Sequence, residues 1–257
     1  MFLAICTMVL AACSKGDEEM SQVARQTVQF TMVSIESRAS LSEASCGYLY
    51  VYDDGELIET QTSEDENFGS LTLDLDYGQH NLSFVAAVKS LDDSSCADAF
   101  GGTLSLDVSS STGAQEVTLS RVVSRLKLVI SDAIPSSVST VTVTCNPRYI
   151  HCGADLLGVS SSTSSSTTTI DISKSRGKQD VSLTFYSYCP SLTDEWSQTV
   201  DVVFKNADGD VVASRSSIAV PLRCNRETTV RSYWFSSSTS MQIGVDTDWL
   251  EGIEINS

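Results

Sequence analysis

The chain has 257 residues, with 33 acidic side chains against 16 basic ones, and a formal net charge of −17 at pH 7. A surface this acidic repels phosphate backbones and anionic headgroups, so the composition argues against a nucleic-acid partner. Hydrophobic residues make up 41% of the chain, which is ordinary for a globular protein and argues against global disorder. The length is sufficient for two domains of ordinary size.

The N-terminus carries a short apolar segment that ends in a cysteine. The run from Phe2 to Val9 is too short to cross a bilayer as a helix, which needs about 20 apolar residues, and is typical of a signal peptide. The next residues, Leu10 to Cys13, resemble the lipobox of bacterial lipoproteins. That resemblance implies cleavage before Cys13 and a diacylglycerol on its thiol. We therefore expect residues 1–12 to be a lipoprotein signal peptide and acyl chains to hold the mature protein at a membrane.

Polar and acidic residues follow the cysteine. Residues 13–24 include the run Asp17 to Glu19, and this composition predicts a solvated tether without a core of its own. The same residues resemble the acidic export signal of surface lipoproteins in Bacteroidales. The resemblance implies a location on the outer face of the outer membrane.

The cysteine count is also typical of an exported protein. Cys6 leaves with the leader and Cys13 is expected to be acylated, so six of the eight cysteines remain. An even number in an exported chain predicts disulfides. If pairing stays within the domains, Cys46 has only Cys96 available, and these two are the candidate disulfide. The pairing of the other four stays open: Cys145, Cys152, Cys189 and Cys224.

Almost every segment alternates apolar and polar residues, as half-buried antiparallel strands do. The first such segment places Val28, Phe30 and Met32 on one face. Asp54-Gly55 and Asp208-Gly209 predict hairpins, because this dipeptide supplies the positive φ angles of a tight turn.

Two further segments bear on the organisation of the chain. Ser160 to Thr169 is nearly all Ser and Thr, which predicts a flexible loop. Around Arg121 two strand patterns follow each other with little turn material, so we place a domain boundary there. The expected fold is all-β, with one antiparallel β-sandwich over residues 25–120 and a second over residues 121–257.

The order of motifs resembles a family of lipid-anchored fimbrial subunits of Bacteroidales, the fimbrial anchor and fimbrillin-like lipoproteins. The resemblance implies two transthyretin-like β-sandwiches and a place in a fimbrium on the cell surface. The matching segments span most of the mature chain: residues 49–55, 77–87, 119–128 and 220–230, and the closing Asp248-Trp249-Leu250.

The resemblance also implies a mode of assembly, in which a strand of one subunit completes the sheet of its neighbour. An added strand satisfies a row of edge N–H and C=O groups, and its alternate side chains fill pockets. In the polymerising subunits of the family, a protease cuts after an arginine and removes the first strand. Arg38 follows the first predicted strand here and is the candidate proteolytic site. If Arg38 stays uncut, Cys13 remains attached and the protein anchors instead of polymerising; the alternative is a stalk or tip fimbrillin.

The sequence offers little for catalysis or metal binding. His80 and His151 are the two histidines, and Cys145, His151 and Cys152 do not have a recognised zinc spacing. Nucleophile-elbow, phosphate-loop and dinucleotide motifs are absent from the sequence. We therefore expect no enzyme, no catalytic residues, no cofactor and no metal.

The partners that we expect are other fimbrial subunits, joined by strand insertion, and the outer membrane. A second function remains open, a glycan-binding surface lipoprotein, which would need aromatic side chains exposed together on one face. The candidates are the tyrosines and Trp196, Trp234 and Trp249.

Overall fold

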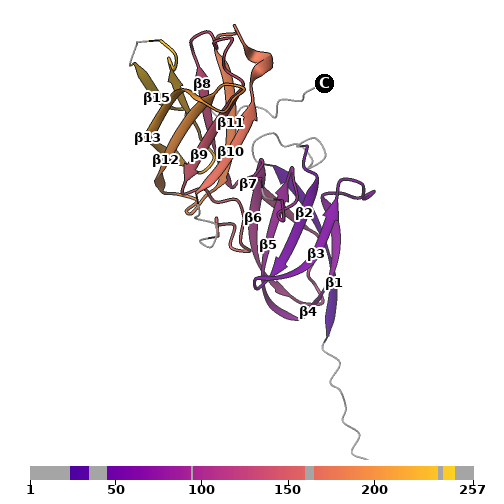
Figure 1. Cartoon of the computed structure of the whole chain (residues 1–257). Coiled ribbons are helices and arrows are strands. Elements are labelled where there is room, and N and C mark those ends of the chain that lie inside the picture. Colours follow the sequence, from indigo (N-terminus) through magenta and orange to yellow (C-terminus); the bar gives the residue numbers. More distant parts are fainter. Residues whose placement is uncertain (1–23, 35–44, 94, 160–164, 237–239, 247–257) are drawn as a thin grey trace, which may run out of the picture.

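In the computed structural model the described residues are 24–34, 45–93, 95–159, 165–236 and 240–246 (Figure 1). These residues form strands, together with a single 3-10 turn at Ser173–Ser175. The strands of the first half are β1 (Arg25–Ser34), β2 (Tyr48–Asp53), β3 (Glu56–Thr62), β4 (Ser70–Asp76), β5 (Gly78–Ala87), β6 (Ala99–Val108) and β7 (Gln115–Arg121). Those of the second half are β8 (Val123–Ile130), β9 (Thr140–Asn146), β10 (Ser166–Asp171), β11 (Val181–Tyr188), β12 (Glu195–Lys205), β13 (Val211–Arg223), β14 (Glu227–Ser232) and β15 (Met241–Asp246).

The first seven strands are hydrogen-bonded in the order β3-β2-β5-β6-β7-β1-β4. The sheet is nearly broken between β6 and β7, where Phe100 pairs with Arg121 and Gly101 with Ser120. It therefore folds over into two layers, β3-β2-β5-β6 and β7-β1-β4. Gly102 lies at this fold, where a Cβ would stand 2.5 Å from the carbonyl oxygen of Thr118. Only a residue without a side chain allows the two strands to come this close.

A compact apolar core, which we call the first core, fills the space between these two layers. Its largest fully buried side chains come from both of them: Phe30, Met32 and Leu119 from one, and Leu49, Leu82, Phe84 and Phe100 from the other. The alternation read from the sequence has its physical cause here, because in strands such as β4 and β7 every second side chain points into this core.

The second half forms two separate sheets, β10-β9-β12-β13 and β11-β8-β14-β15. They enclose a core of their own, which we call the second core. It contains Phe204, whose ring lies 5.5 Å from that of Trp234. Both predicted hairpins are present, with positive φ at Asp54, Gly55 and Gly209. The predicted all-β sandwich architecture is confirmed.

Two strand pairs depart from the antiparallel pattern. β1 runs parallel to β7, and β8 runs parallel to β14. In each half the first strand thus pairs in parallel with a strand from late in that half. The Ser/Thr tract also departs from expectation, because Ser166–Asp171 forms the edge strand β10 against β9. The expectation of a flexible loop is wrong for residues 166–169, and residues 160–164 lie outside the described chain.

The two halves lie end to end and meet at a third apolar cluster (Figure 1). We call it the junction cluster; its buried members are Tyr50, Val85, Ala87, Cys96, Ala99, Val122, Val123, Leu156 and Tyr188. β7 ends at Arg121 and β8 begins at Val123, so the chain passes from one half to the other through this cluster. The domain boundary near Arg121 stays a prediction. Within the described ranges, no helix has the length and apolar character needed to cross a bilayer.

Candidate functional site

The first strand, β1, occupies an interior position in its layer. It is hydrogen-bonded on one side to β4, where Val28 pairs with Leu73, and on the other to β7, where Met32 pairs with Val117. The two pairings are staggered along the strand: Arg25 to Thr31 pair with β4, Phe30 to Ser34 pair with β7, and the two ladders overlap at Phe30 and Thr31. Taking β1 away would expose two strand edges at once, those of β4 and β7.

The side chains of β1 fill the first core. Val28, Phe30 and Met32 are 1%, 0% and 2% exposed. The ring of Phe30 lies 5.7 Å from that of Phe84, which belongs to the opposite layer. Without β1 the layer would hold an apolar slot, and three large side chains worth about 1.5–3 kcal/mol each would no longer be buried there.

Polar contacts hold the outer face of β1 in register. Arg25 pairs with Asp76 at 2.7 Å, and the hydroxyl of Thr27 donates to the carboxylate of Asp74. The ion pair is largely exposed to solvent, and pairs of that kind contribute little to stability. The strand is therefore held mainly by its backbone and its buried side chains.

The chain enters and leaves β1 through residues outside the described ranges. Cys13 precedes the first described residue, and Arg38 falls in the gap between Ser34 and Ser45. Lipidation of Cys13 and cleavage at Arg38 thus stay predictions. Arg38 follows the last residue of β1 by four positions in the sequence, so a cut there would separate β1 covalently from the rest of the fold.

The two cysteines of the predicted disulfide belong to different clusters. Cys46 is buried in the first core, and Cys96 is buried in the junction cluster. Burial raises the pKa of Cys46 to about 12, with Asp98 adding to the effect. The Cys46–Cys96 pairing stays a prediction. Another two cysteines are neighbours, because the Cys224 thiol adds to the burial that raises the pKa of Cys189.

A buried ion pair borders the junction cluster, and the sequence reasoning missed it. Arg121 donates twice to the carboxylate of Asp98, at 2.7 and 2.9 Å, and its guanidinium lies 4.9 Å from the ring centre of Phe100. A usable signal was present, because Arg121 has the same strand parity as the buried Val117 and Leu119. A charged residue at an inward position predicts a buried partner.

Both histidines contact polar groups within the fold. His80 Nδ1 lies 2.6 Å from the carboxylate of Asp53, and Nε2 lies 2.9 Å from the carbonyl oxygen of Asp76. Burial lowers the pKa of His80, but these hydrogen bonds and the charges of Asp53 and Asp54 outweigh that effect, so the pKa is raised overall. His151 Nδ1 contacts the carbonyl oxygen of Leu91 at 3.2 Å. Over the described ranges, no group of three or more His, Cys, Asp and Glu side chains is arranged to hold a metal ion.

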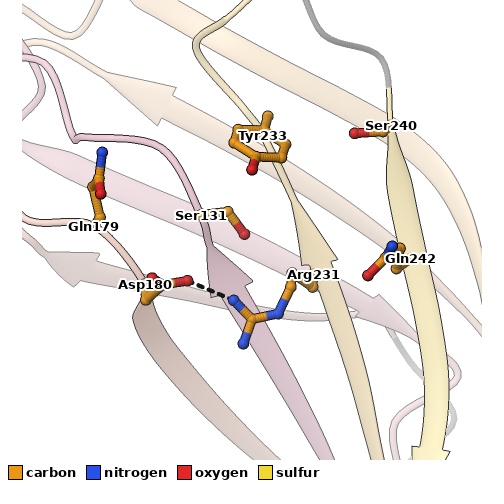
Figure 2. A pocket seen from close by; sticks show the side chains of 7 residues that line it. All are labelled: Ser131, Gln179, Asp180, Arg231, Tyr233, Ser240 and Gln242. Carbon is orange, nitrogen blue, oxygen red and sulfur yellow. Dashed lines mark hydrogen bonds and ion pairs between the residues drawn. The ribbon is translucent and has the colours of Figure 1, made fainter.

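A polar pocket of about 300 Å³ opens on the second half (Figure 2). Arg231 of β14 reaches across it to Asp180, just before β11, and Tyr233 borders the same hollow. The lining is almost entirely polar: Ser131, Gln179, Asp180, Arg231, Tyr233, Ser240 and Gln242. The pocket offers hydrogen-bonding groups and one aromatic ring, with no nucleophile beside a base.

Comparison with models of protein families identifies the family of the chain. The family model described as "Family of unknown function (DUF6562)" matches residues 15–256. The chain belongs to this family. No curated protein matches the sequence.

Solved structures of low sequence identity have a similar fold. A "putative adhesin" of Bacteroides thetaiotaomicron is 11% identical, with a TM-score of 0.53 over 90% of this chain and 98% of that one. A protein of the same species, described among "putative polysaccharide binding proteins", is 10% identical, with a TM-score of 0.52 over 87% and 96%. The fimbrial anchor protein Mfa2 of Porphyromonas gingivalis is 10% identical, with a TM-score of 0.45 over 87% and 98%. At such identities the first two matches establish a shared fold alone.

Proposed function

We propose that this protein is a non-catalytic lipoprotein on the outer face of the outer membrane that anchors or forms part of a fimbrium. It joins other fimbrial subunits by β-strand complementation. The observation that supports this proposal most directly is the position of β1, an interior strand whose Val28, Phe30 and Met32 are buried in the first core. A strand so placed leaves a slot of its own shape if it is removed.

Retention or loss of β1 decides between the two roles. With Arg38 intact, β1 stays joined to the lipidated Cys13 and the first sheet is complete. The protein then anchors, and it offers other strand edges to its partners. A cut after Arg38 would release both β1 and the lipid anchor, because each lies on the N-terminal side of the cut. The freed slot between β4 and β7 would then accept a donor strand, as a polymerising subunit requires.

The proposed tether suits an anchor. Residues 13–24 lie between the acylated cysteine and β1, and a chain of this length spans at most about 40 Å when extended. The sandwiches would thus be held near the membrane surface while the acidic tether keeps them clear of it. Two or more acyl chains give the stable attachment that one chain alone does not.

The glycan-binding alternative has less support. Among the described residues, the large exposed aromatic side chains are Tyr77 and Tyr233, one on each half of the chain. Trp234 is buried, and Trp196 is half-buried. Sugar rings stack best where aromatic faces are exposed together, and the described surface separates them.

Exchange of β1 tests strand complementation. A single cleavage site introduced after residue 38 of the purified protein lets β1 be cut from the fold. A fluorescent peptide with the sequence of Arg25–Ser34 should then replace the severed strand and bind stably, since it satisfies both edges and fills the slot. The matched control is the same peptide with Phe30→Asp, which should not bind because it would bury a charge. Equal binding of both peptides, or of neither, would reject the slot.

A further inference from the structure

Two cysteines at the ends of strands in opposite sheets come together beside the junction cluster. Cys189 directly follows β11, and Cys224 directly follows β13. β11 and β13 belong to the two different sheets of the second half. Cys189 is 0% exposed and Cys224 is 8% exposed, so both side chains lie inside the protein.

The backbone fixes both residues against the same short segment. The N–H of Cys189 donates to the carbonyl oxygen of Val122 at 3.2 Å. The N–H of Asn225, next to Cys224, donates to the carbonyl oxygen of Val123 at 3.0 Å. The Cys224 thiol itself lies 3.5 Å from the carbonyl oxygen of Arg121. These bonds bring the two cysteines to neighbouring places on one strand junction, where the Cys224 thiol is close enough to raise the pKa of Cys189.

We propose that Cys189 and Cys224 form a disulfide that joins the two sheets of the second half at the end facing the first half. The step removes the two thiol protons and two electrons and forms one S–S bond. The electrons pass to a disulfide oxidant, a thiol–disulfide exchange protein outside the cytoplasm, whose own disulfide is reduced to two thiols. The proposal rests on the proposed function in one respect, since such oxidants act on exported chains.

The alternatives left open by the sequence are less well placed. Cys145 lies within β9, with Ser166 and Val200 as its cross-strand neighbours, and is buried in the second core. Cys152 borders the junction cluster and is only partly buried. Of the pairings open to these four cysteines, the geometry favours the one that joins Cys189 to Cys224. The Cys46–Cys96 prediction is compatible with it.

Burial of the two thiols determines when the disulfide can form during folding. Desolvation raises the pKa of the Cys189 thiol, and the neighbouring Cys224 raises it further. The reactive species in exchange is the thiolate, so a thiol in these surroundings is inert once the fold has closed. The bond therefore forms while β11 and β13 are still docking, and afterwards it is shielded from reductants.

The test is differential labelling of the full-length protein purified from the cells that export it. The protein is unfolded in denaturant with an excess of N-ethylmaleimide and without reductant, then digested and analysed by mass spectrometry. We expect Cys145 to carry the label, Cys189 and Cys224 to carry none, and one linked peptide pair to join residues 189 and 224. A sample reduced beforehand is the control and should carry label on all three.

A second experiment tests the disulfide independently of whether the protein is exported. The same protein is reduced, unfolded and refolded in a mixture of glutathione and glutathione disulfide. Formation of the 189–224 link in this buffer supports the proposal even if the native sample lacks it, and the missing native link would then count against export. Label on both cysteines in both arms, or a link from either one to Cys96 or Cys152, would overturn the proposal.

Discussion

The ring of Phe30 on β1 lies 5.7 Å, centre to centre, from the ring of Phe84 on β5, and the two rings join opposite layers of the first sandwich. Both side chains are 0% exposed. Phe30→Ala should therefore lower the free energy of unfolding by about 3–5 kcal/mol, because it removes a buried ring and leaves a cavity. Denaturant unfolding measures the change. The control is Leu57→Ala on β3, whose side chain is 50% exposed and whose loss should stay within about 0.5 kcal/mol. Similar losses for both variants would mean that β1 does not complete this core.

The Arg121–Asp98 pair should be sensitive to loss of one partner. The side chains are 4% and 19% exposed, so Arg121→Met leaves a largely buried carboxylate without its cation. We expect a loss of about 3–5 kcal/mol in unfolding free energy. Arg25→Met breaks an ion pair of 64% and 44% exposed side chains and should cost no more than about 1 kcal/mol. Adding Asp98→Leu to the first variant should recover much of the loss, and failure to do so would contradict the electrostatic explanation.

Alanine should have different effects on stability at two glycines, because Gly102 is closely packed at the fold between β6 and β7 and Gly113 is not. In Gly102→Ala the new methyl would meet the carbonyl oxygen of Thr118 at 2.5 Å, and that backbone atom has little room to move. We expect a loss of about 1–3 kcal/mol in unfolding free energy. Gly113→Ala adds the same methyl where no atom lies within 4 Å, so it should be nearly neutral. Equal effects at the two sites would show that the clash is not the cause.

His80 predicts a pH dependence of stability. Both of its ring nitrogens face acceptors, the carboxylate of Asp53 and the carbonyl oxygen of Asp76, so both hydrogen bonds form fully only in the imidazolium. Because the folded-state pKa is raised, this stabilisation is fully present below the unfolded pKa of about 6.5 and is lost as pH rises through the folded value. Thermal unfolding from pH 5.5 to 8.5 should therefore show wild type and His80→Gln converging as pH rises. A constant difference between them would contradict this assignment.

The sequence predicted the strands well and their partners less well. The alternation around Phe30 and the Asp-Gly hairpins are local properties, since each depends on neighbouring residues alone. The parallel pairing of β1 with β7 is different, because it joins segments far apart in the chain, and alternation does not name a partner. The alternation that includes Val117 and Leu119 would be the same whichever strand β7 paired with.

Two misses have specific physical causes. The Ser/Thr tract predicts a loop because it has few core-forming side chains. As an edge strand, β10 needs backbone pairing more than burial, and its Thr167 and Thr169 hydroxyls bond to Thr144 and Thr142 on β9. The approach of Cys189 to Cys224 depends on how two sheets stack, which no spacing in the sequence reveals. Cys13 was identified from a lipobox-like motif and Arg38 from its place after the first predicted strand. Both lie outside the described residues, and the proposed choice between anchor and stalk depends on them.

The most direct test of the proposed function is the intact mass and the N-terminal residue of the protein isolated from its native outer membrane. The account predicts a blocked, acylated Cys13, with residues 25–34 still attached, which means an anchor whose first sheet β1 completes. An unlipidated chain that begins at Ala39 would contradict the anchor and would mean a subunit matured by proteolysis after Arg38.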